Sequence, residues 1–165
     1  MSLVSRSLIL WGLIIAGCSS EPLAVDPLVV EVGGANFVGD GFVSWATPGS
    51  DAAVITGFQG GQHIWVSVRS KLSNAEIFDT SVAMYREATG SDAEAYVKPG
   101  PIEIMRKTQL VDGWQVVAGI PAFVKEPCKV RAHRLRVEAV VRSGDGRIAT
   151  GKAWIVPHYD GYCDP

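Results

Sequence analysis

Three histidines have the clearest capacity for chemistry in this chain: His63, His133 and His158. Imidazole nitrogens suit copper or zinc, and residues far apart in sequence can meet on neighbouring strands. The spacing argues against a metal site, because no HxH, HxxxH or CxxC pattern occurs and His133 lies in the basic run KVRAHRLR. We therefore predict no metal and no cofactor, and keep a metal or small-ligand carrier that uses these histidines as an alternative function.

Hydrolytic chemistry has no recognisable signature in the sequence. There is no GxSxG or HExxH pattern, and the carboxylates are scattered among turn-forming residues instead of pairing within strands. We expect a protein without enzymatic activity. An enzyme whose site is assembled in space is the second alternative.

The stretch GFQGGQHIWVSVR, from Gly57 to Arg69, sets a glycine pair before a β-prone run. The glycines predict a bend. In the strand that follows, side chains alternate between two faces. One face carries Ile64, Val66 and Val68, and the other carries His63, Trp65, Ser67 and Arg69. We take His63, Trp65 and Arg69 as candidate ligand-facing residues, with a purely structural role for Gly60, Gly61 and His63 as the alternative.

A basic run between residues 125 and 147 is the one local charge asymmetry. Within it, Arg134 and Arg136 share a strand face and are further candidate ligand-facing residues. They could meet a polyanion such as lipopolysaccharide or an acidic envelope protein. The alternative is a solvated sheet face that discourages edge pairing.

Short β-prone runs separated by turn formers position these side chains. The expected strands are Leu28–Val32, Gly41–Trp45, Ala53–Phe58, Gln62–Ser70, Ile77–Arg86, Ile102–Leu110, Trp114–Ile120, Val130–Arg142 and Arg147–Val156. About seven to nine strands at this spacing predict an all-β fold, an antiparallel sandwich resembling immunoglobulin-like modules. A small β-barrel is the competing architecture.

The first residues read as a targeting segment. Arg6 precedes the apolar run 8–15, and Ile15-Ala16-Gly17-Cys18 resembles the lipobox of bacterial lipoproteins. The resemblance implies that residues 1–17 are a signal peptide and that Cys18 is acylated. Residues 18–27 would then be a tether and 28–165 the β-sandwich domain. Ser19 favours sorting to the outer membrane. An ordinary secretory signal is the alternative.

Charge excludes one class of partner. The chain has 15 basic and 17 acidic residues, so no nucleic-acid partner is implied. The expected attachments are the membrane, through the acylated Cys18, and an envelope protein or polyanion.

Cys128 and Cys163 remain after Cys18 is assigned to lipid. An even pair in an oxidising compartment predicts a disulfide. The segment VEAVVRSGDGRIATGKAWIV looks like a hairpin turning at Ser143–Gly146, and counting outwards from the turn brings the two cysteines close together. A metal-binding or free-thiol role is the alternative.

One further likeness concerns the stretch QGGQHIWVSVR. It resembles uncharacterised bacterial envelope lipoproteins that carry a QGG-x-H-x-x-V-x-x-R strand in an immunoglobulin-like domain. That resemblance implies a fold and a cellular address, and no activity. The sequence therefore predicts a lipid-anchored, non-enzymatic binding or structural module of the cell envelope.

Overall fold

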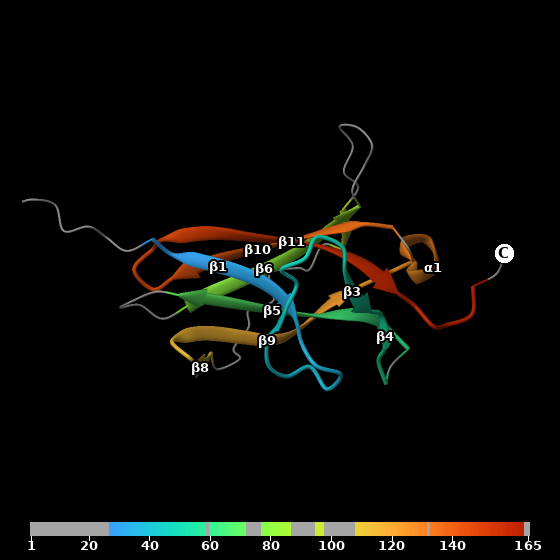
Figure 1. The fold of residues 1–165 in the computed structure, drawn as a ribbon, viewed down its shortest axis with the longest axis horizontal. Helices are drawn as coiled ribbons and strands as arrows, with labels where there is room; N and C mark the ends of the chain where they lie inside the picture. The colour runs from blue at the N-terminus through green and yellow to red at the C-terminus, as the bar shows by residue number, and fades with distance from the viewer. Residues whose placement is uncertain are drawn as a thin grey trace, which may run out of the picture.

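Two stacked β-sheets make up the computed structural model (Figure 1), which describes residues 27–58, 60–71, 77–86, 95–97, 108–131 and 133–163. Across these ranges, no helix has the length and apolar character needed to cross a membrane. The expected signal peptide, Cys18 and the tether up to residue 26 lie outside the described residues. The same holds for most of the strand expected at 102–110.

The first sheet has six strands: β1 (Val29–Gly34), β2 (Val43–Ser44), β4 (Ile55–Thr56), β5 (Gln62–Lys71), β8 (Gln109–Val111) and β9 (Trp114–Phe123). They lie in the order β2-β1-β5-β9-β8, and β4 pairs with β5. All pairings in this sheet are antiparallel.

The second sheet has five strands: β3 (Ser50–Ala53), β6 (Ile77–Arg86), β7 (Ala95–Val97), β10 (Leu135–Ser143) and β11 (Ile148–His158). Their order is β3-β11-β10-β6-β7, and β3 pairs with β11 in parallel. The chain therefore leaves the edge of the first sheet after β2 and joins the edge of the second. A four-residue helix, α1 (Pro127–Val130), precedes β10.

The all-β prediction is confirmed, and the described residues contain more strands than expected. The difference comes from β3 and β7, which are four and three residues long and correspond to no separate expected strand. The strand expected to begin at Val130 is wrong at its start, because the chain there forms α1 and a turn. Pro127, whose ring fixes φ and which has no N–H to donate, suits the first turn of a helix.

The core lies between the two sheets and follows the alternation seen in the sequence. Ile64, Val66 and Val68 of β5 are buried, and β10 contributes a second inward row. That row is Leu135, Val137, Ala139 and Val141. Ser67 departs from the expected pattern, since it is also fully buried. A register shift between Val66 and Val68 accompanies it, and its hydroxyl donates a 2.7 Å hydrogen bond to the Gly41 carbonyl.

The sheets approach each other closely where β1 crosses β11. A Cβ added to Gly151 would lie 2.9 Å from both the carbonyl oxygen and the Cγ1 atom of Val30. Real Cβ atoms do not come that close to backbone. Glycine at this position therefore sets how tightly β1 packs on the second sheet.

The β10–β11 hairpin turns where the sequence indicated. The Ser143 N–H donates to the Arg147 carbonyl at 2.9 Å, and Gly146 has a φ of +86°. Beyond the open end of the hairpin, Cys128 of α1 and Cys163 form a disulfide, with their Cα atoms 5.6 Å apart. The bridge is consistent with the pairing expected from the sequence, and it joins α1 to the segment after β11.

Candidate functional site

A tight turn between β4 and β5 carries the start of the candidate site. The Gly57 N–H donates to the Gly61 carbonyl at 2.8 Å, and the Gly60 N–H donates to the Gly57 carbonyl at 2.9 Å. Gly60 has a φ of +79°, a conformation that glycine adopts without strain. The bend expected from the glycine pair is therefore present. It delivers His63 to a position between Ile55 of β4 and Phe123 of β9.

His63 is surrounded by aromatic rings and is only 6% exposed. Its ring meets Trp65 edge to face with centroids 4.3 Å apart, and Phe123 lies 6.2 Å away in a similar arrangement. The Nε2 atom is buried and has no hydrogen-bond partner. Leaving a buried polar atom unpaired costs about 1–3 kcal/mol. The unpaired nitrogen makes His63 the first candidate residue of this site.

An open recess of about 520 Å³ adjoins this imidazole. It is lined by Gly57, Phe58, Gly61, His63, Trp65, Pro121 and Phe123. Among the described residues, no charged side chain lines the recess, and its volume lies within the range of ligand pockets, about 300–1,000 Å³. Phe58 is fully exposed at its rim, and Phe123 is half exposed. The recess suits an uncharged group that is apolar or ring-bearing.

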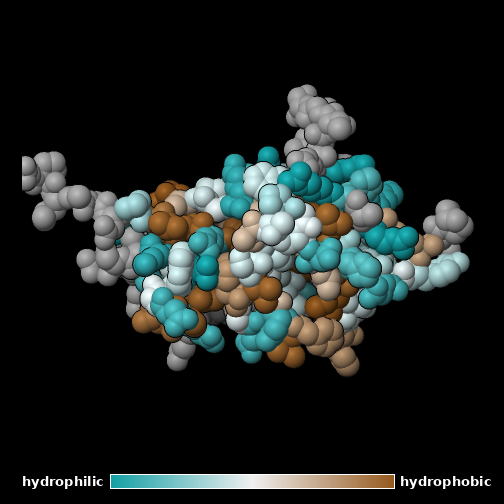
Figure 2. Space-filling view, in the orientation of Figure 1, coloured by the Kyte–Doolittle hydropathy of each residue, from teal (hydrophilic) through white to brown (hydrophobic). Residues whose placement is uncertain are grey.

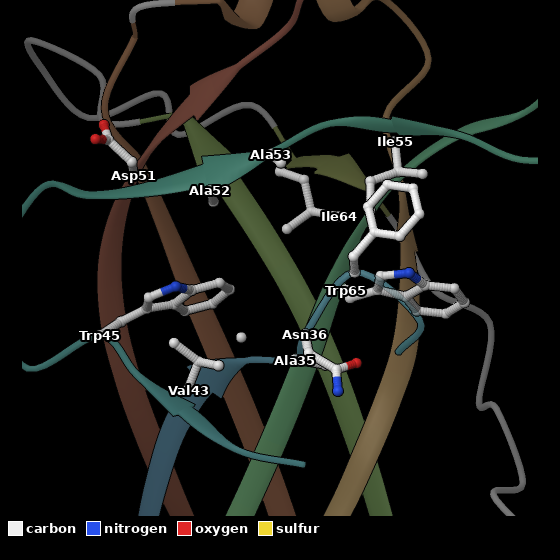
Figure 3. A pocket seen from close by; sticks show the side chains of 12 residues that line it. Ala35, Asn36, Val43, Trp45, Asp51, Ala52, Ala53, Ile55, Ile64 and Trp65 are labelled. Carbon is white, nitrogen blue, oxygen red and sulfur yellow. The ribbon is translucent and has the colours of Figure 1, made fainter. Parts of the chain in front are cut away.

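A second, smaller crevice of about 200 Å³ lies on the other side of Trp65. Figure 3 shows Trp45 and Trp65 facing each other across it, with Ile64 and Ala52 between them. The β1–β2 loop forms part of its wall, and a Cβ on Gly39 of that loop would lie 3.2 Å from the Trp65 indole. Trp65 is thus the shared wall of both hollows.

Apolar side chains continue from the recess onto the loops around it. We call this set the aromatic surface: Phe37, Val38, Phe58, Trp65 and Phe123. Phe37 is 81% exposed and Val38 is 72% exposed. Figure 2 shows brown surface at the lower side of the view, where the β1–β2 and β4–β5 loops project in Figure 1. Neighbouring exposed apolar side chains mark interaction sites, whereas single exposed apolar side chains are common on any protein.

Arg69, expected to face a ligand, is engaged inside the protein. Its guanidinium lies between the rings of Phe42 and Trp114, 4.4 Å from each centroid. It also forms an ion pair with Glu31 at 2.5 Å. These contacts tie β5 to β1 and to the start of β9, so Arg69 is placed to hold the first sheet together.

Arg136 lies in β10 of the second sheet, and Arg134 lies just before that strand. The Arg136 guanidinium sits 5.0 Å from the Tyr85 ring centroid, and its Nε is 3.3 Å from a Glu138 oxygen. Lys152 approaches the same carboxylate at 3.1 Å. Arg134 lies 5.8 Å from the Trp154 ring centroid. The surface around these residues is therefore an alternation of cations, rings and one shared carboxylate, which weakens its attraction for a polyanion.

The structure does not gather the histidines. His133 is exposed after α1, and His158 is exposed at the end of β11, where its Nε2 lies 2.7 Å from Asp160. Among the described residues, no group of three or more His, Cys, Asp or Glu side chains could hold a metal ion. The described residues therefore offer no metal site built from these three histidines.

Sequence reasoning singled out His63 and Trp65 and missed the other aromatic walls. Phe58 carried a local signal, since it follows Gly57 at the end of the expected strand Ala53–Phe58 and stands just before the predicted bend. Phe123 carried none, because its place opposite His63 depends on the pairing of β5 with β9. Phe37 likewise comes from a loop whose position beside Trp65 follows from the fold.

Fold and site together define an all-β, two-sheet protein with an uncharged aromatic recess at one end. No protein-family model matches the chain, and no curated protein matches it. A solved structure of a DUF4466 family protein from Parabacteroides merdae is similar at 12% sequence identity and a TM-score of 0.35. The likeness covers 79% of this chain and 45% of that chain, so this chain spans less than half its length. The description of that protein names no ligand and no activity.

Proposed function

We propose that the chain is a non-enzymatic binding module of the bacterial cell envelope, anchored in the outer membrane through an acylated Cys18. The lipobox-like segment supports the address. An immunoglobulin-like plan for the body is supported by the strand order. The strands β1, β5, β9 and β8 correspond to A, B, E and D, and β6, β10 and β11 correspond to C, F and G.

The observation that carries a binding role is the recess beside His63. A buried imidazole nitrogen without a partner is destabilising on its own, and the His63 side chain that carries it lines a hollow with aromatic, uncharged walls. A bound partner that turns the ring, so that Nε2 faces the recess and receives one hydrogen bond, would remove that penalty. Occupation of the site would therefore stabilise the protein by removing this cost, which an ordinary surface does not carry.

The extent of the aromatic surface favours a protein as the partner. Its exposed side chains reach beyond the recess onto two loops, and a molecule confined to the recess would leave Phe37 and Val38 in water. Their combined apolar area is on the order of 600 Å², since each aromatic ring can bury about 150–250 Å². A standard protein interface buries about 800 Å² per partner. The partner is an envelope protein that offers an apolar, uncharged contact surface.

In-cell photo-crosslinking tests this function. A photoreactive residue is placed at Phe58 or Phe123, and at Val140, an exposed apolar position on the other sheet, as the matched control. We expect one discrete heterologous protein product from the first two positions and none from the control. The product from position 58 should disappear when Phe123 is changed to Ser.

Three results would contradict the proposal. Equal products from all three positions would mean that the aromatic surface has no special role. A product at twice the mass of the chain would mean a second copy as the occupant. No product at all would mean that the surface is unoccupied in the envelope. The address is tested separately by mass spectrometry of the native protein, in which an unmodified Cys18 with the leader still attached would refute the lipid anchor.

A further inference from the structure

The end of the sandwich at which the described chain begins also carries exposed apolar side chains. They are Val29, Leu110, Val111 and Ile148. Leu110 is 76% exposed and Ile148 is 55% exposed. Figure 2 shows brown surface at the left of the view, where β9 and β11 begin in Figure 1. This set, which we call the tether-end rim, is separate from the aromatic surface.

Strand register places these residues at one end of the molecule. Val29 pairs with Lys71, the last residue of β5, and Val111 pairs with Trp114, the first residue of β9. The second sheet contributes Ile148, the first residue of β11. The close crossing of β1 over Gly151 brings the start of β11 alongside β1. Turns from both sheets therefore surround the point where the chain enters the fold.

We propose that the tether-end rim rests on the lipid bilayer, so that the body is docked on the membrane as well as tethered to it. The proposal depends on the acylated Cys18 of the proposed function. The chain before Pro27 leads from this end to Cys18, and its nine residues reach at most roughly 30 Å. A tether of that length allows the body either to touch the bilayer or to stand away from it. Exposed leucine, isoleucine and valine gain by leaving water, which favours contact.

The charges around the rim indicate which lipids are needed. Described ionisable residues at this end are Lys71, Asp79, Asp112, Arg142, Asp145 and Arg147, and both signs occur. Asp145 and Arg147 also pair with each other. Attraction to anionic headgroups needs a basic cluster, which these residues do not form. The contact is therefore apolar, and neutral phosphatidylcholine suffices.

Docking in this way fixes the orientation of the recess. The rim and the β1–β2 and β4–β5 loops lie towards opposite ends of the strands (Figure 1). With the rim on the bilayer, the aromatic surface faces away from the membrane that holds the protein. A partner reaches it without competing with lipid.

Depth-dependent quenching tests the contact. The full lipidated chain is placed on phosphatidylcholine vesicles with a polarity-sensitive fluorophore at Leu110→Cys or, as the matched control, at Phe58→Cys. Brominated phosphatidylcholine is the quencher. We expect quenching at position 110 to exceed that at position 58 at least threefold, with a blue shift only at position 110. Ile148→Cys serves as an independent second position should Leu110→Cys lose its folded circular dichroism spectrum.

Each other outcome is decisive. Protein that floats with the vesicles while both fluorophores stay in water would overturn the docking and leave the anchor intact. Protein that does not float would overturn the lipid anchor and the docking with it. Stronger quenching at position 58 would mean that the aromatic surface, and not the rim, meets the membrane. Crosslinking at the recess in cells is unaffected by the first of these results, so the two proposals fail separately.

Discussion

Replacing His63 by phenylalanine should stabilise the protein and abolish recognition at the same time. Phenylalanine keeps a flat ring that can retain the edge-to-face contact with Trp65, and it removes the buried nitrogen that has no partner. The extra atoms have space, because the side chain borders an open recess of about 520 Å³. The substitution thus separates the effect of the imidazole on stability from its role in recognising the partner.

The magnitude follows from the unpaired atom. An unsatisfied buried polar group costs about 1–3 kcal/mol, and a well-placed apolar replacement recovers most of it. We expect the free energy of unfolding of His63→Phe to rise by about 1–2 kcal/mol. For a domain of this size the melting temperature should rise by roughly 3–6 °C. His63→Ala, which removes the ring as well, should be destabilising and serves as the control.

Two measurements check this prediction. Denaturant unfolding of the wild type and both variants gives the stabilities, and crosslinking from position 58 gives the recognition. A His63→Phe variant less stable than the wild type would mean that the nitrogen is satisfied in the folded protein. Unchanged crosslinking would mean that the partner ignores Nε2. Either result would refute the reasoning from the unpaired atom.

Other predictions concern the fold around the site. Removing the Cys128–Cys163 bridge opens a loop with a sequence separation of 35 and should cost about 4 kcal/mol on the chain-entropy model; thiol labelling of the unreduced, denatured mature chain should find no free thiol. Gly151→Ala should cost about 1–3 kcal/mol in a denaturant titration, because the new Cβ meets the backbone of β1; Gly61→Ala, whose new Cβ would lie 3.6 Å from its nearest neighbour, should cost far less. Hydrogen bonds from the side chain of Arg147 are the main reason that the pKa of Asp145 lies well below its usual range. This carboxylate therefore contributes stability above the pKa of an unfolded aspartate, and the contribution is lost as pH falls below that value. An NMR titration that finds an ordinary aspartate pKa would contradict this.

The strands most easily predicted are those with one face on the core. In β10, the row from Leu135 to Val141 alternates with outward-facing residues that are polar except for Val140, and the structure buries the row. In β5 the same alternation holds for Ile64, Val66 and Val68. A period of two residues is a local property of the sequence, so it is visible without knowledge of the partner strands.

The site was harder to predict, because its walls come from separate elements. Phe123 faces His63 only through the pairing of β5 with β9. Arg69 looked available to a ligand, and only the arrival of Phe42 and Trp114 on either side of it shows its internal role. The sequence pattern around His63 identified the imidazole and one wall of the recess, Trp65. The remaining walls depend on contacts that alternation cannot reveal.

The early strands also bear on how the protein withstands pulling. Tension between a membrane anchor and a partner held at the recess would act along β1, whose six residues pair with β5 by hydrogen bonds that run across the direction of the strand. Such bonds share a lengthwise load and must give way together, whereas bonds pulled from one end open one at a time. The parallel β3–β11 pairing fastens the same part of the chain to the other sheet. We expect the body to resist extraction by force better than its thermodynamic stability alone would indicate.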